Sequence, residues 1–127
     1  MMINVLIVGS GGREHAFTWK ASQSDLVEKI FIAPGNAGTS LEPKAENIAI
    51  SVTDIDALVS FSKKEDIDLV IVGPEDPLVN GITDAFKEAG INCFGPESLG
   101  AQLEGSKDFA KAFMKRHNIP TASYKSF

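Results

Sequence analysis

Short apolar runs recur along the chain and predict the strands of a parallel sheet. The first run contains no polar residue and ends at Gly9, which is typical of a strand that is buried on both faces. Four further runs are rich in Ile, Val and Phe and are bounded by Pro, Gly, Asn or Asp. We therefore predict five strands, at Val5 to Val8, Lys29 to Ala33, Asn47 to Ile50, Leu69 to Val72 and Ile91 to Phe94.

Helical spacing of apolar residues follows several of these runs. It predicts helices at Ala16 to Ala21, at Ile55 to Ser62 and at Val79 to Ala89, the last followed by Gly90, a residue type that commonly ends a helix. The segment from Ala33 to Asn47 is rich in Gly and Pro and predicts a loop. Strands that alternate with helices indicate right-handed crossovers. The pattern thus predicts an α/β fold, a Rossmann-like doubly wound parallel sheet of about five strands.

The pattern changes after the fifth predicted strand. Two consecutive helices are predicted at Ser98 to Glu104 and Ser106 to Arg116, with no strand between them, and Thr121 to Phe127 is typical of the first strand of a further unit. We expect residues 1–103 to form one domain and residues 104–127 to be a linker helix and the start of a truncated second domain.

Composition narrows the classes of protein without selecting one. Of the 127 residues, 43% are hydrophobic and 23% are charged, as in ordinary globular domains. The net charge of -5 and the scattered lysines disfavour nucleic-acid binding. No apolar run approaches the roughly 20 residues of a membrane span, and the first residues lack the features of a secretory signal. We expect a cytoplasmic protein without membrane contact.

Cysteine and histidine are too few for most metal or disulfide chemistry. Cys93 is the only cysteine, and the two histidines are far apart, so we expect neither an internal disulfide nor a metal site. Because Cys93 lies in an apolar run, an inert core thiol is the expected interpretation.

Glycine and proline concentrate at the ends of the predicted strands. Four strands run directly into loops of this kind, and the carboxyl ends of parallel strands share one edge of the sheet. Ligands of open parallel sheets bind beyond that edge, near the point where the strand order reverses. The four loops are Gly9 to His15, Pro34 to Gly38, Gly73 to Gly81, and Gly95-Pro96.

The first loop, GSGGREHA from Gly9 to Ala16, predicts a phosphate site. It joins a buried strand to a helix, where backbone N–H groups and the helix dipole attract anions. A dinucleotide fingerprint would need glycine at the position of Glu14 and an acidic residue where Ala33-Pro34 ends the second strand. NAD binding, and with it the nucleotide-binding domain of an oxidoreductase, is therefore disfavoured.

Charged and amide side chains in these loops have competing interpretations. Arg13 lies in a first helical turn, where the dipole disfavours a cation, so it is predicted either to bind an anion or to pair with a surface carboxylate. Glu14 either suits the helix dipole or contacts the ligand. Glu75 either accepts hydrogen bonds from sugar hydroxyls or an amine, or is a solvated carboxylate, and Asp76 is expected to cap a helix. Asn36 is a further candidate ligand, although an ordinary turn would have the same sequence.

Taken together, these segments resemble the N-terminal domain of the phosphoribosylamine–glycine ligase family, also called glycinamide ribonucleotide synthetases, which are ATP-grasp enzymes. The order and spacing of the segments carry the resemblance, which covers the whole chain. They are VLIVGSGGREHA, APGNAGT, DLVIVGPEDPLVNGI, FGP, LEGSKDFAKAFM and IPTASY.

The resemblance implies a function in purine biosynthesis. Enzymes of this family join glycine to 5-phosphoribosylamine, using ATP and Mg²⁺, through a glycyl phosphate. It implies that this chain is the pre-ATP-grasp domain, that the catalytic, ATP and Mg²⁺ sites lie outside it, and that the chain alone is inactive and binds no cofactor tightly. Lys107 lies where the ATP-grasp part would begin. The residues implied to touch phosphoribosylamine are Gly11, Gly12, Arg13, Glu14, Pro74 and Glu75.

Two other classes remain as alternatives. One is another ATP-grasp enzyme with the same domain, such as a biotin-dependent carboxylase or a carboxyaminoimidazole ribonucleotide synthase, which the REHA and GPEDPL segments disfavour. The other is a non-catalytic interaction module, which would bind no small molecule.

Overall fold

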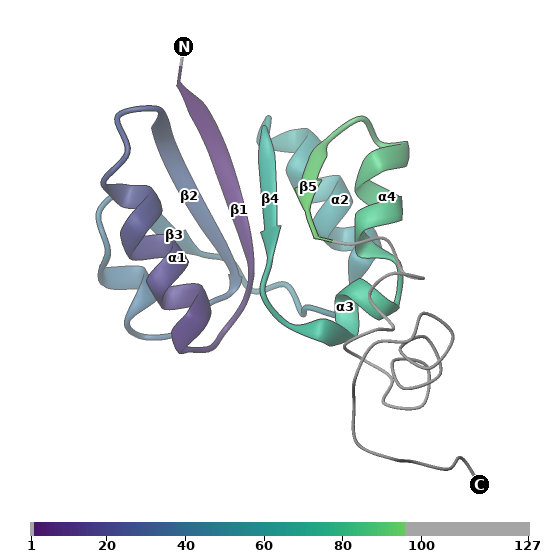
Figure 1. Cartoon of the computed structure of the whole chain (residues 1–127), viewed down its shortest axis with the longest axis horizontal. Helices are drawn as coiled ribbons and strands as arrows, with labels where there is room; N and C mark the ends of the chain where they lie inside the picture. The colour runs from purple at the N-terminus through teal and green to yellow at the C-terminus, as the bar shows by residue number, and fades with distance from the viewer. Residues whose placement is uncertain (1, 96–127) are drawn as a thin grey trace, which may run out of the picture.

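Five parallel strands form one sheet in the computed structural model of the chain, which describes residues 2–95 (Figure 1). This confirms the predicted α/β doubly wound sheet. The predicted elements beyond residue 95, Lys107 and the domain boundary after residue 103 lie outside the described residues. The strands are β1 (Ile3–Gly9), β2 (Val27–Pro34), β3 (Ala45–Asn47), β4 (Leu69–Val72) and β5 (Asn92–Phe94), in the order β3-β2-β1-β4-β5.

Helices cover both faces of the sheet. They are α1 (Gly12–Ser22), the 3-10 helix η1 (Thr39–Leu41), α2 (Ile55–Lys64), α3 (Glu75–Val79) and α4 (Ile82–Glu88). On one face, Phe17 and Ala21 of α1 pack against Val5 and Ile7 of β1. The other face is more extensively covered, because α2, α3 and α4 bury Leu58, Leu78, Ile82 and Phe86 against it. Burial of β1 on both faces explains its continuous apolar sequence.

The strand order reverses beside β1. The chain builds outward from β1 through α1 to β2 and β3, and α2 then leads it back to β4, which pairs with the free side of β1. At the carboxyl edge Val8 lies opposite Val72, and Gly9 lies opposite Pro34. The loops after β1 and β4 therefore begin at the same edge of the sheet and lead away from each other. Loops at a ligand-binding switch point have this arrangement.

The third strand lies earlier than predicted. The prediction of Asn47 to Ile50 is wrong, since β3 ends at Asn47 and the following residues are not in a strand. Ile48 and Ile50 instead pack half-buried against the core. Their apolar character reflects this burial. The Ile48 N–H still donates to the Ile32 carbonyl of β2 at 2.8 Å, although Ile48 is not in a strand. The loop predicted from Ala33 to Asn47 also contains η1 and most of β3.

The predicted helix from Val79 to Ala89 is α4, which begins only at Ile82, while Val79 is the last residue of the separate helix α3. Gly81 adopts a left-handed φ of 90° between α3 and α4, so the helical ladder is interrupted although the apolar spacing continues across it. Gly90 has a φ of 75° and follows the end of α4, which confirms the predicted terminus. The first helix begins at Gly12, earlier than the predicted start at Ala16.

Cys93 is half-buried in β5 and packs against the core, so the prediction of a buried core thiol is only partly correct. Burial raises the pKa of the Cys93 thiol, and a contact of 3.8 Å with the Thr83 hydroxyl lowers it by less. A raised pKa favours the neutral thiol at physiological pH, as an inert cysteine requires.

Candidate functional site

A cavity of about 390 Å³ opens at the reversal point, beyond the carboxyl ends of β1 and β4. The turn between β1 and α1 forms most of its wall, and the loops before α2 and α3 complete it. Its lining residues are Gly9, Ser10, Gly11, Gly12, Arg13, Glu14, Val52 and Pro74.

The Glu14 carboxylate is buried in the wall of this cavity. Glu14 is only 3% exposed, although it lies in the first turn of α1. Its carboxylate lies against the backbone of Gly9, at the end of β1, and of Gly73, just after β4, so a Cβ atom at either glycine would overlap it. Glycine at both strand ends therefore creates the space for the carboxylate. A buried carboxylate requires a donor or a cation nearby.

Arg13 supplies the only ion pair that Glu14 makes within the described residues. The guanidinium nitrogen Nη2 lies 3.7 Å from Glu14 Oε1, and the Arg13 side chain is 51% exposed. Of the two interpretations of Arg13, pairing with a carboxylate is therefore seen, but the carboxylate is a buried one. At this distance the pair is loose, and the planar guanidinium retains donors that an anion can use.

Backbone donors that have no helical acceptor border the same cavity. Gly11 is the N-cap of α1 and no side chain caps the helix. The Gly11 carbonyl accepts the first helical hydrogen bond, from the His15 N–H at 3.1 Å. The N–H groups of the first turn precede this bond and lack helical acceptors. Together with Arg13 they form a positively polarised wall suited to a phosphate.

Asn36 lies beside this wall but does not line the cavity. Its Oδ1 accepts hydrogen bonds from the N–H groups of Gly38 and Thr39 at 2.8 and 2.9 Å. Its Nδ2 donates to the Ser10 carbonyl at 2.9 Å. The amide is therefore engaged within the protein, unlike the free amide expected of a direct ligand contact.

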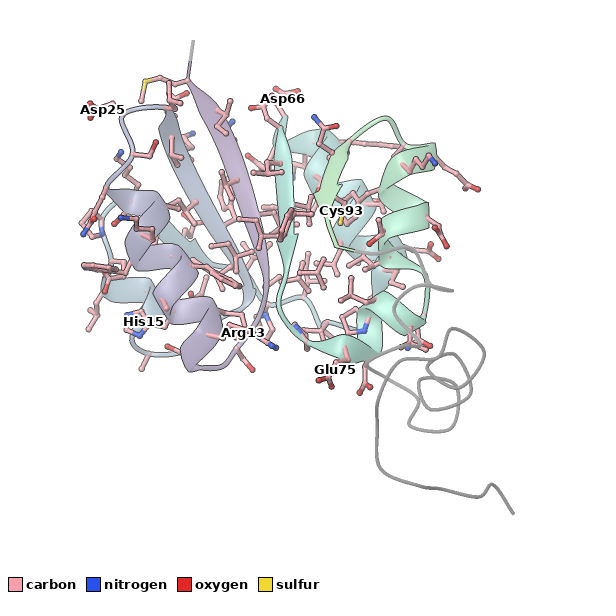
Figure 2. The ribbon with its side chains drawn as sticks, in the orientation of Figure 1. Arg13, His15, Asp25, Asp66, Glu75 and Cys93 are labelled. Atoms are coloured by element: carbon pink, nitrogen blue, oxygen red, sulfur yellow. The ribbon has the colours of Figure 1, made fainter. Side chains whose placement is uncertain are left out.

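The third predicted loop, Gly73 to Gly81, contributes its proline to the cavity and not its acids. Pro74 lines the cavity, whereas Glu75 is exposed in the first turn of α3. Glu75 and Arg13 lie at the same edge of the sheet (Figure 2), but Glu75 is not among the cavity residues. The expectation that Asp76 caps a helix is wrong: the N-cap of α3 is Pro74, and Asp76 lies inside the first turn.

Two features of the site were not predicted. Val52 enters the cavity from the segment that leads back from β3 to α2, and no sequence motif marks it. The Glu42 carboxylate oxygen Oε1 lies 2.9 Å from His15 Nε2 and accepts its hydrogen bond, which joins α1 to the end of η1. Within residues 2–95 no group of three acidic, histidine or cysteine side chains could hold a metal ion. No helix in this part of the chain is long and apolar enough to span a membrane.

The fold and the cavity define a class of protein: a doubly wound parallel α/β domain with a glycine-rich, anion-attracting turn at its switch point. The chain matches the family described as phosphoribosylglycinamide synthetase, N domain, over residues 3–104, and it belongs to this family. This confirms the family resemblance of the sequence.

Individual relatives agree with the family match. The chain is 63% identical to the phosphoribosylamine–glycine ligase of Vibrio vulnificus over 98% of its own length and 29% of that protein. A crystal structure of the Thermotoga maritima phosphoribosylamine–glycine ligase matches 95% of this chain and 26% of that one, with a TM-score of 0.63 and 30% identity. A biotin carboxylase domain from Hydrogenobacter thermophilus, solved with MgADP, ADP and bicarbonate, shares the fold at a TM-score of 0.66 and 19% identity, matching 95% of this chain and 29% of that one. The chain thus spans less than a third of each of these relatives.

Proposed function

We propose that this chain is the phosphoribosylamine-binding domain of a cytoplasmic ligase that joins glycine to 5-phosphoribosylamine, with cleavage of ATP to ADP and phosphate. The reaction is a step of purine biosynthesis and yields glycinamide ribonucleotide. The observation that carries the proposal is the cavity of a family member that combines unpaired helix N–H groups, Arg13 and the buried carboxylate of Glu14.

Each group in the cavity matches a part of phosphoribosylamine. The first-turn N–H groups and the Arg13 guanidinium would hold the phosphate, because both favour a doubly charged oxyanion. Glu14 would accept hydrogen bonds from the ribose hydroxyls or the amine, since a carboxylate offers several acceptor positions beyond its pair with Arg13. Pro74 fixes the loop that closes the wall, and the exposed Glu75 would reach the sugar from the rim.

The described residues do not fit a Mg²⁺ site. The cavity offers a single carboxylate, which is already paired with Arg13, whereas Mg²⁺ prefers several oxygen ligands in octahedral geometry. We therefore derive no step through metal or ATP from these residues. Both would bind in the remainder of the polypeptide, and glycine would be activated there.

Replacing Arg13 by alanine in the complete enzyme is expected to raise the KM for phosphoribosylamine about tenfold, the scale of one charge-assisted hydrogen bond. The KM for ATP should change less than twofold. Steady-state measurement of ADP release checks this, and Glu75→Gln is expected to have a smaller effect in the same direction. Lys20→Ala is the matched control, since Lys20 is an exposed cation in the last turn of the same helix. Equal losses for phosphoribosylamine and ATP would contradict the assignment of Arg13.

The 127-residue chain by itself is expected to fold but to release no ADP. The described sheet buries a core on both faces, so a cooperative thermal transition should be measurable. Catalysis should be absent, because ATP and Mg²⁺ are proposed to bind in the remainder of the polypeptide and residues 2–95 contain no group of three acidic, histidine or cysteine side chains for a metal ion. The assay combines the chain with glycine, MgATP and freshly generated phosphoribosylamine. ADP release that depends on both substrates, above a blank without protein, would contradict the expectation.

A further inference from the structure

A polar cluster behind the cavity wall connects β2, η1 and β3. We call Asn36, Thr39 and Asn47 the clasp. Thr39 is fully buried, and its hydroxyl lies 2.8 Å from the Asn36 N–H and 2.6 Å from Asn47 Oδ1. Asn47 Nδ2 donates to the Asn36 carbonyl at 2.7 Å. The backbone and side chain of Asn36 are therefore held from several directions.

Close packing leaves the clasp little freedom. Gly35, immediately before it, has a left-handed φ of 73°, and a Cβ atom there would overlap the Asn47 amide. The Gly35 N–H donates to the Gly9 carbonyl at 3.0 Å, which ties the same loop to the end of β1. The Asn36 side chain is therefore already held in one conformation. It loses little further conformational entropy when it binds the neighbouring glycine turn.

The clasp reaches the glycine turn through one amide group. Asn36 Nδ2 donates to the Ser10 carbonyl at 2.9 Å and lies 3.5 Å from the Gly11 carbonyl. In a trans peptide the carbonyl and the following N–H point in opposite directions. Since the Ser10 carbonyl points toward Asn36, the Gly11 N–H points away from the clasp, and Gly11 lines the cavity. The Gly11 carbonyl likewise points toward Asn36, so the Gly12 N–H points away from the clasp.

We propose that Asn36 is a positioning residue, which orients the Ser10 to Gly12 peptides so that their N–H groups bind the phosphate of the substrate. It does not itself touch the substrate. The turn needs such a device, because it contains three glycines, Gly9, Gly11 and Gly12, and no side chain caps the helix that follows. Glycines of this kind otherwise sample many conformations. The proposal rests on the function proposed above.

Two substitutions separate this role from the folding of the loop. Asn36→Asp and Asn36→Ser each keep an oxygen that can accept from the Gly38 and Thr39 N–H groups, but both lose the donor to Ser10. The serine variant does so without introducing a charge. Ser40→Ala is the control, because the Ser40 hydroxyl donates to the Ala37 carbonyl in the same loop and has no hydrogen bond to the turn.

In the complete enzyme, both Asn36 variants are expected to raise the KM for phosphoribosylamine roughly three- to tenfold, the effect of one lost hydrogen bond. The KM for ATP and for glycine, and kcat at saturation, should stay within twofold, and Ser40→Ala should change none of them. A merely structural role would instead lower the active fraction, so that kcat falls and every KM is unchanged.

The two proposals fail in different ways. If the wild-type enzyme forms ADP with phosphoribosylamine and both folded Asn36 variants keep its KM within twofold, the positioning role is overturned and the proposed function stands. A fall in kcat alone, or failure of both variants to fold, overturns the positioning role in favour of a structural one. If the wild-type enzyme shows no activity that depends on phosphoribosylamine, both proposals are overturned.

Discussion

Replacing Gly9 by alanine is expected to lower the free energy of unfolding of the domain by about 2–4 kcal/mol, in the range of strained or overpacked core substitutions. Gly9 has a φ of 139°, a backbone conformation that side chains with a Cβ rarely adopt, and the added methyl would overlap the Glu14 carboxylate. The backbone at the end of β1 cannot relax freely, because the Gly9 carbonyl accepts the Gly35 N–H.

Urea denaturation of the 127-residue chain, with Gly12→Ala as the matched control, measures this effect. Gly12 lies in the same turn, but a Cβ atom there would have no neighbour within 4 Å. Alanine at this helical position should be neutral or slightly stabilising. Equal unfolding midpoints for the two variants would show that Glu14 moves aside and that the strain at Gly9 is small.

Replacing Gly73 by alanine is expected to lower kcat/KM for phosphoribosylamine up to about a hundredfold, the upper range for a charge-assisted hydrogen bond. The new methyl would expel the Glu14 carboxylate from its place between β1 and β4. Glu14→Gln should cause a loss of similar size, since it removes the charge and leaves the shape. Because both changes act through one carboxylate, the double variant should be little worse than the worse single variant.

Two further measurements distinguish an effect on the phosphoribosylamine site from a general loss of activity. The KM for ATP should change less than twofold in all three variants. Glu28→Gln is the matched control for the charge change, because Glu28 is an exposed acid on β2 outside the cavity. Fully multiplicative losses in the double variant would show that Gly73 and Glu14 act independently, and the shared role of the carboxylate would then be wrong.

The elements with a strong apolar pattern were the ones that the sequence could predict. β1 contains the apolar run Val5 to Val8, β4 is the apolar run Leu69–Val72, and the apolar stripe of α2 starts and ends close to its prediction. β3 could not be located in the same way. It is a three-residue edge strand, Ala45–Asn47, with a single apolar residue, and the apolar Ile48 and Ile50 that follow it belong to the core without being in the sheet.

The sequence predicted where the cavity lies but not how its residues are arranged. Glycine-rich loops at the ends of parallel strands indicated the edge of the sheet at which the cavity opens and the Gly11 to Glu14 turn that lines it. The burial of Glu14 could not be predicted, since an acid in a first helical turn suits the dipole in any case, and the space for it depends on Gly9 and Gly73, which are far apart in the chain. The engagement of Asn36 with Ser10 is likewise a long-range contact without a local signal.

Because the strands are parallel, the amino and carboxyl edges of the sheet lie at opposite ends of the domain. One edge can therefore be modified without affecting the other. Asp25 and Asp66 lie at the amino edge of the sheet, opposite Arg13 and Glu75 (Figure 2). β1 has seven residues, so at a rise of about 3.3 Å per residue the two edges are roughly 20 Å apart. At this amino edge, the Asn4 backbone N–H donates to the Asp68 carboxylate at 2.9 Å, which ties β1 to the residue before β4. The exposed turn at Asp25 is therefore a suitable attachment point for a fluorophore or an immobilisation tag that leaves the cavity open.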